Sequence, residues 1–449
     1  MERKTKQHKQ VILLLACSAI FFESFDVSIV NLSLQSISSS IHVTLASTQW
    51  VQTVYLVSFG SFLLLGGRMC DHWGSKIIFL IGMFLFGISS LAASTCDGLG
   101  QLLFIRGIQG IGASLSMPAA IAIISLVFEE GTERNKAFGI FGAFAAIGFA
   151  LALSLGGIIT TYFDWHWIFS STAPILFLVL LLGMKYLPAV VKDQDKKFNF
   201  SASILLVFSL LILCYGVHSI SIRSFSWIVY ILTGLSGAFV MLYYDRKSKN
   251  PFFDRAAISR INIRGQLSGF ILGASFLGFV FIATLVLSDI FGMSNSNVGF
   301  LLLPFSILSA LVSKVILPVL FRQFDVKGVV LISMFSLFAG TLILLIAATW
   351  KLYYLVLLAL FLVNSCCIAI GYPSITILSL RGIKPEAQGM AAGIQSSLYT
   401  IGSSIGISFV SLFLTFKSEV SYYIPIVCSC VLFILLSMIA VKLLMEDNK

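Results

Sequence analysis

Charge is what this sequence has least of. Only 11% of its 449 residues are charged, whereas soluble globular proteins carry about 25%. Proline is rare as well, with 9 residues, and the 8 cysteines include no Cys-x-x-Cys pair and no Cys/His spacing that suits zinc. The scarcity of charge excludes an ordinary soluble protein, and the cysteine pattern leads us to expect no metal, no cofactor and no disulfide framework.

Apolar residues, by contrast, make up 58% of the chain, and its mean hydropathy is +1.00. A membrane-spanning helix needs roughly 20 mostly apolar residues, and spans must be helices because unpaired backbone groups are costly in lipid. The sequence therefore predicts an all-α integral membrane protein. Fourteen stretches fit this template: 11–36, 48–67, 77–96, 100–126, 137–161, 167–187, 200–219, 227–244, 266–290, 298–320, 328–348, 352–380, 388–416 and 420–441.

Basic residues predict the orientation of these spans, because Lys and Arg concentrate in cytoplasmic loops. With fourteen spans and a cytoplasmic N-terminus, 24 of the 29 Lys and Arg residues fall in cytoplasmic segments. We therefore expect a multi-pass protein of the plasma (inner) membrane with both termini in the cytoplasm. The formal net charge of +10 reflects this topology and does not indicate nucleic-acid binding.

Two charged segments divide the spans into groups of six, two and six. They cover residues 188–199 and 245–265. We predict an N-terminal six-helix bundle (1–187), a two-helix insertion with its flanking loops (188–265) and a C-terminal six-helix bundle (266–449). Secondary transporters are commonly built from such repeated halves.

The loop after the second span carries the pattern G-x-x-x-D-x-x-G-x-K. A tight connection needs glycine for its turn, and the aspartate can pair with a base or a helix N-terminus in one conformation and lose that contact in another. This loop resembles motif A of the major facilitator superfamily, although His72 and Ser75 stand where the family usually has Arg. The resemblance implies a role in conformational gating for Gly67, Asp71, Gly74 and Lys76.

The fourth span holds Arg106 and Gln109 in a segment that resembles motif B of the same family, R-x-x-Q-G-x-G. An arginine inside a membrane costs roughly 2.5–3.5 kcal/mol, so we expect it to face a cavity or a carboxylate. Snorkelling of its long side chain to the outer surface is the alternative.

The fifth span is rich in glycine, with Gly148, Gly156 and Gly157 spaced as in motif C of exporters. Ala152 and Leu153 replace the Gly-Pro of that motif, which weakens the implication of export. Small residues also let helices pack closely without any further role. We assign these glycines to gating as a hypothesis and keep simple packing as the alternative.

The first span resembles the L-D-x-T-I-V-N segment of the fourteen-helix drug:proton antiporter branch, with Asp26 and Asn31 in register. Trp165-His166-Trp167-Ile168-Phe169 is similar to a W-R-W-I-F segment of that branch. The resemblance implies the major facilitator fold, with two pseudo-symmetric six-helix bundles that rock around a central cavity, and energy supplied by a proton gradient.

Glu23 and Asp26 are three residues apart and therefore share one face of the first helix. Burial and a second nearby carboxylate both favour the neutral form of such a group, so exchange of a proton near neutral pH is feasible. We take Asp26 as the main coupling carboxylate, with Glu23 as an accessory group or substrate contact and Arg106 as part of the same machinery. Candidate cavity residues, each of which could equally hold helices together by hydrogen bonds, are Asn31, Gln49, Gln52, Tyr55, Gln109, Asn364, Gln395 and Tyr399.

The function that these features predict is proton-coupled export of small amphipathic or cationic molecules by alternating access. The expected partners are the small-molecule substrate, protons and the lipid bilayer, with no nucleic acid, and we expect a monomer. An importer of the same superfamily and a lipid or metabolite exporter are the alternatives. We do not expect an enzyme, because no nucleophile, metal or paired-histidine cluster stands out in the sequence.

Overall fold

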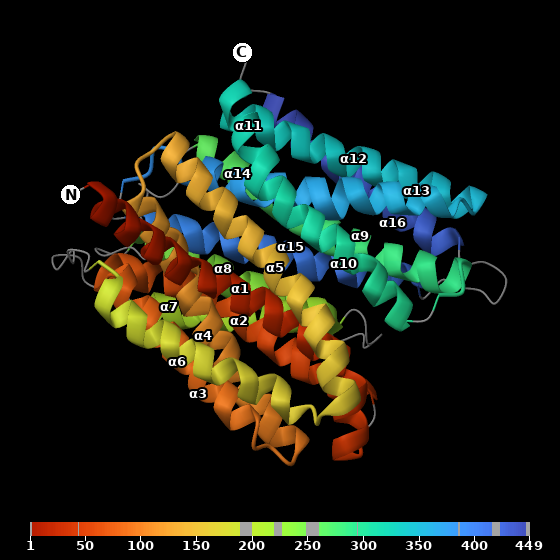
Figure 1. Cartoon of the computed structure of the whole chain (residues 1–449), viewed down its shortest axis with the longest axis horizontal. Helices are drawn as coiled ribbons and strands as arrows, with labels where there is room; N and C mark the ends of the chain where they lie inside the picture. Colours follow the sequence, from red (N-terminus) through yellow and green to blue (C-terminus); the bar gives the residue numbers. More distant parts are fainter. Residues whose placement is uncertain are drawn as a thin grey trace.

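The computed structural model is helical throughout the part of the chain that it describes, and that part contains no strand (Figure 1). Its helices run as a bundle of long rods, with both termini toward the same side of the molecule. The described residues are 2–43, 45–188, 200–219, 227–247, 260–293, 295–384, 387–414 and 423–445.

The first half of the chain forms single, mostly long helices. Six of them we call the N-terminal group: α1 (Glu2–Ile41), α2 (Leu45–Trp73), α3 (Ser75–Ala93), α4 (Leu99–Val127), α5 (Thr132–Tyr162) and α6 (His166–Tyr186). Two further helices, α7 (Phe200–Ser219) and α8 (Trp227–Lys247), pack against each other.

The second half, which we call the C-terminal group, differs in that several rods contain a short π-helical turn. Its α-helices are α9 (Arg260–Leu285), α10 (Asn295–Leu311), α11 (Leu317–Gln323), α12 (Val326–Trp350), α13 (Tyr353–Leu360), α14 (Ile368–Leu380), α15 (Gln388–Leu414) and α16 (Tyr423–Met445). The π-helical turns are η3 (Val286–Ile290) after α9, η4 (Val312–Ile316) between α10 and α11, and η5 (Phe361–Cys367) between α13 and α14.

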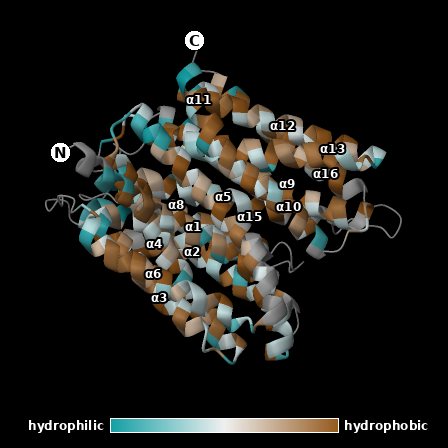
Figure 2. Cartoon of the chain, viewed as in Figure 1, coloured by the Kyte–Doolittle hydropathy of each residue, from teal (hydrophilic) through white to brown (hydrophobic). Residues whose placement is uncertain are grey.

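Each of the fourteen predicted spans coincides with one helix or one continuous rod of the described chain. Eleven of these rods are long and apolar enough to cross a membrane, and the other three predicted spans correspond to α5, α7 and α15. Figure 2 shows hydrophobic residues along the lengths of the rods and hydrophilic ones gathered toward their ends. The predicted all-α membrane fold is thereby confirmed.

Packing follows the two halves of the chain. Within the N-terminal group α1 packs on α5 and α4 on α2 and α3, and within the C-terminal group α9 packs on α15 and α12 on α16. Helix α7 contacts both α2 and α15 and so touches both groups. The predicted domain limit at 187/188 follows the end of α6, whereas the limit at 265/266 lies inside α9. The division into three domains remains a prediction.

The two groups meet closely on the side where both termini lie, which the basic residues predict to be cytoplasmic. A Cβ at Gly67 of α2 would stand 2.3 Å from the carbonyl oxygen of Gly389, and one at Gly142 of α5 would stand 2.7 Å from the ring of Pro373. Contacts this short leave room for no side chain. The structure is therefore closed on its predicted cytoplasmic side.

Candidate functional site

A buried ion pair lies at the centre of the N-terminal group. Nη1 of Arg106 in α4 stands 2.6 Å from Oδ2 of Asp26 in α1, and the exposed fractions of the two side chains are 0% and 7%. Nε of Arg106 donates to the carbonyl oxygen of Val51 in α2 at 3.1 Å. As expected, the membrane arginine faces a carboxylate, and it does not snorkel to the surface.

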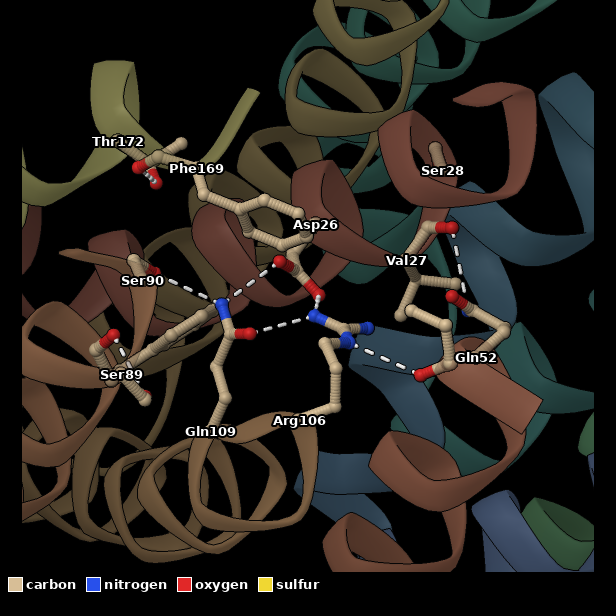
Figure 3. A network of polar contacts seen from close by, with 12 residues as sticks. Asp26, Val27, Ser28, Gln52, Ser89, Ser90, Arg106, Gln109, Phe169 and Thr172 are labelled. Atoms are coloured by element: carbon tan, nitrogen blue, oxygen red, sulfur yellow. Dashed lines mark hydrogen bonds and ion pairs between the residues drawn. The ribbon is translucent and has the colours of Figure 1, made fainter. Parts of the chain in front are cut away.

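Gln109 completes this network from the same face of α4. Its Oε1 accepts from Nη1 of Arg106 at 2.8 Å, while its Nε2 donates to Oδ1 of Asp26 at 3.0 Å and to Oγ of Ser90 at 2.9 Å (Figure 3). The amide oxygen of Gln109 thus accepts from the arginine, and the amide nitrogen donates to the carboxylate. Charge-assisted hydrogen bonds of this kind are roughly twice as strong as neutral ones, so Gln109 fixes the geometry of the pair.

The sequence pattern of α4 explains why these side chains meet. Arg106 and Gln109 are three residues apart and so lie on one face of the helix. A Cβ at Gly110 would stand 2.5 Å from the carbonyl oxygen of Tyr55, and one at Gly112 would stand 2.7 Å from the backbone nitrogen of Phe86. The glycines therefore let α4 approach α2 and α3 closely enough for its polar side chains to reach across.

Tyr55 closes the network on the side of α2. Its ring is fully buried and lies 4.2 Å from the guanidinium carbon of Arg106, a distance at which a cation is attracted to the face of an aromatic ring. Tyr55 was predicted to line the substrate cavity, and the structure places it against the arginine.

Glu23, one turn from Asp26, has different surroundings. It is partly exposed, its carboxylate accepts a hydrogen bond from the neighbouring Ser24 hydroxyl at 3.1 Å, and no ion pair within the described residues includes it. Glu23 is therefore a carboxylate without a basic partner among the described residues.

Tyr372 and Tyr399 form an edge-to-face pair, with ring centroids 5.1 Å apart. Tyr399 was predicted from the sequence as a cavity residue, and Tyr372 was not. The only local feature of the sequence that marks Tyr372 is the neighbouring Pro373, which breaks the regular hydrogen bonding of α14. The pairing of two tyrosines from α14 and α15 is a product of the tertiary structure.

The other predicted cavity residues do not form one cluster. Gln52 donates to the carbonyl oxygen of Val27 at 3.3 Å, Asn364 is buried in the π-helical turn η5, and Gln395 is fully buried beside Gly269 of α9. Gln395 thus points into the C-terminal group. The side chains of Asn31 and Gln49 lie outside the described part of the structure.

The predicted gating residue Asp71 joins the two groups. Its two carboxylate oxygens accept from the backbone nitrogens of Gly389 at 2.8 Å and Met390 at 2.9 Å, in the first turn of α15. A carboxylate is stabilised there by the unpaired N–H groups and the positive end of the helix dipole. This contact joins α2 to α15 across the closed, predicted cytoplasmic side.

The remaining gating candidates act within one group. Nζ of Lys76 donates to the carbonyl oxygens of Met184 and Leu187 at the end of α6, at 2.9 and 2.8 Å, and Gly74 has a φ of 93°, which permits the sharp connection between α2 and α3. A Cβ at Gly148 would stand 2.5 Å from the carbonyl oxygen of Phe21 in α1. Gly156 is buried as well, and the surroundings of Gly157 lie outside the described part.

Comparison with known proteins decides the family. The model of the Major Facilitator Superfamily matches residues 16–407. This chain belongs to the Major Facilitator Superfamily. The proton:xylose symporter XylE has the same fold, with a TM-score of 0.71 at 15% identity over 99% of this chain and 97% of that one.

Curated relatives of this facilitator are named for drug resistance and for transport. It is 29% identical to Multidrug resistance protein Stp of Mycobacterium tuberculosis, over 88% of this chain and 74% of the relative. Identity is 25% to Multidrug resistance protein 3 of Bacillus subtilis (80% and 70% covered) and 25% to Riboflavin transporter RibZ of Clostridioides difficile (93% and 92% covered).

Two side chains of this facilitator make polar contacts that were not predicted. Oγ of Ser313 in η4 donates to the carbonyl oxygen of Gly139 at 2.7 Å and so joins the two groups. On the opposite side of the molecule, Nδ1 of His166 lies 2.5 Å from Asp164 and its Nε2 lies 3.0 Å from the carbonyl oxygen of Cys96. His166 thereby links two loops.

Proposed function

We propose that this protein exports small amphipathic or cationic molecules in exchange for protons. The observation that carries the proposal is the contrast between the two acids of α1: Asp26 is held by Arg106 and Gln109, and Glu23 has no basic partner in the described structure. The drug-resistance names of the relatives support export, and membership of the superfamily supports proton coupling.

The charges of the site suggest how a proton and a cation exchange. With both acids ionised, two negative charges face the single positive charge of Arg106, so the site carries one net negative charge. A monovalent cation that reaches Glu23 neutralises the site. A proton taken up by Asp26 does the same, because Arg106 and the ionised Glu23 then balance each other. Proton and substrate compete for one charge, which is the requirement for antiport.

The contacts of Asp26 suggest how protonation is communicated to the helices. When its carboxylate accepts a proton, Arg106 loses the ionic partner at 2.6 Å, and a proton on Oδ1 weakens the hydrogen bond that this oxygen accepts from Gln109. These side chains tie α1, α2, α3 and α4 together. A change in their hydrogen bonds therefore biases the packing of four helices at once.

The test is proton movement in inverted membrane vesicles that contain the wild type, Asp26→Asn or Glu23→Gln. We expect cationic compounds to release protons in the wild type and no release in Asp26→Asn, with Glu23→Gln weakening the response to cations more than to neutral compounds. Glu133→Gln is the matched control, since this acid pairs with Lys9 at 2.9 Å far from the site. An unchanged response in folded Asp26→Asn would refute the assignment of the proton.

Import of a small solute is the second candidate, favoured by the absence of Gly-Pro from α5. The import hypothesis predicts that folded wild-type protein in the same vesicles releases no protons when any of the tested compounds is added. Uptake of a solute that requires an inward proton gradient would then replace the proposed function.

A further inference from the structure

A small cavity lies between the two groups on the predicted cytoplasmic side, away from the site described above. Its volume is about 150 Å³, below the roughly 300–1,000 Å³ of a pocket for a drug-sized ligand. Three of its residues come from α5 and three from the rod of α11. They are Thr132, Asn135, Lys136, Pro318, Phe321 and Arg322.

The polar side chains around this cavity share one property, the ability to donate hydrogen bonds. Lys136 and Arg322 are cations, Thr132 and Asn135 supply a hydroxyl and an amide, and no acid is among the lining residues. All four polar side chains can donate hydrogen bonds, and the other two lining residues are apolar. Convergent donors with two positive charges form the composition of an anion site.

The acids next in sequence to these cations are engaged elsewhere. Glu133 is held by the ammonium of Lys9, whose hydrogen bond keeps the pKa of that carboxyl below its usual range. Asp325 accepts from the backbone nitrogen of Gly328 at 2.9 Å and caps the start of α12. The described contacts of these two acids are therefore with groups other than Lys136 and Arg322.

This arrangement poses an electrostatic problem for closure. Lys136 belongs to the N-terminal group and Arg322 to the C-terminal group, and closing the cytoplasmic side brings both to one cavity. Like charges that approach each other oppose that movement. An anion bound between them would turn the repulsion into attraction from both sides.

We propose that this cavity binds a phosphate group, and that its binding stabilises the state closed on the cytoplasmic side. Arg322 supplies a planar fork suited to phosphate oxygens and Lys136 a point charge, while Phe321 and Pro318 provide an apolar wall. A basic pocket between helices at this level of the membrane suits the headgroup of an anionic lipid. Free phosphate shares the same chemistry.

The test compares thermal unfolding of the full-length protein in lipid nanodiscs of phosphatidylcholine with and without phosphatidylglycerol. We expect phosphatidylglycerol to raise the unfolding midpoint of the wild type, and the double variant Lys136→Gln/Arg322→Gln to lose that shift. The matched control is Lys185→Gln, which removes a basic residue from the end of α6, outside the cavity. A second arm adds inorganic phosphate to protein in neutral detergent, at constant ionic strength against chloride, and separates a free ion from a headgroup.

A further variant ties the site to the closed state. Gly67→Ala should prevent close approach of α2 and α15, so it should lose the shift although it keeps every basic residue. The shift is read from unfolding without substrate or a proton gradient, which makes failure here distinguishable from failure of the transport proposal. Equal shifts in Lys136→Gln/Arg322→Gln and Lys185→Gln, or no shift with either phosphatidylglycerol or phosphate in the wild type, would overturn the proposal.

Discussion

The two groups of helices resemble each other in layout and differ in the chemistry of their interiors. The N-terminal group buries an ion pair, Asp26 and Arg106. Among the described residues of the C-terminal group, the buried polar side chains are uncharged amides and hydroxyls. A repeated fold therefore does not imply a repeated function, and in our proposal one group senses the proton while the other supplies tyrosines and the helix end that Asp71 contacts.

Arg106→Leu should break this contrast most severely. Removing one partner of a buried ion pair leaves the other charge uncompensated, at a cost of about 3–5 kcal/mol. We expect low yields of folded protein and no transport. The double variant Arg106→Leu/Asp26→Leu, which removes both charges, should recover folding measured by thermal unfolding and still fail to couple protons. Equal instability of both variants would contradict this reasoning.

Gly67→Ala probes the boundary between the groups. Its new Cβ would meet the backbone of Gly389, which has no flexible side chain to move aside. We expect a folded protein that cannot close on the cytoplasmic side and whose transport is reduced at least tenfold. Accessibility of introduced surface cysteines near that side measures closure. Gly98→Ala is the control, because nothing lies within 4 Å of the position of its Cβ.

Gln109→Leu and Gln395→Leu compare the two interiors directly. Gln109 holds both members of the ion pair, so its loss should cost about 1–3 kcal/mol of stability and impair coupling. Gln395 is fully buried with Nε2 unpartnered in the described structure, so leucine should change the free energy of unfolding by less than about 0.5 kcal/mol. Denaturation in detergent gives both values, and a reversed order would contradict the contrast.

The smallest effect should come from Glu133 at the surface. Because Lys9 lowers the folded-state pKa of this carboxyl, its contribution is present above the usual pKa of a glutamate and is lost as the pH falls through the folded value. An exposed pair contributes less than about 1 kcal/mol. Glu133→Gln should therefore lower the unfolding temperature slightly at neutral pH and not at all in acid. A difference that grows toward acid pH would contradict this sign.

Much of the fold was predictable because its signals are local. The apolar runs predicted the helices, since a lipid environment demands that backbone groups pair within each span. The expectation that Arg106 faces a carboxylate also followed from sequence, because an unpaired charge in the membrane is costly. The π-helical turns were not predicted, as no residue pattern in η4 or η5 differs from that of an ordinary helix.

The candidate site was predictable only in part. The family resemblance singled out Asp26 over Glu23 as the main coupling acid, but nothing in the sequence told which of the two meets Arg106. Gln109 lies in the segment that resembles motif B and Gln395 lies in no such motif. Both were predicted to line one cavity, and the structure separates them. Hydrogen bonds depend on which helix faces which, and that information is spread over all the glycines and apolar residues that set the packing.

The sequence by itself determined that this chain is a helical membrane protein of the facilitator family, because hydropathy and the short motifs are read within single helices and loops. Only the tertiary structure decided that Asp26 is paired and Glu23 is not, that Asp71 contacts the start of α15, and that Lys136 and Arg322 share a cavity. The physical reason is that charges interact through space over a few ångströms, and residues far apart in the chain reach those distances only through packing.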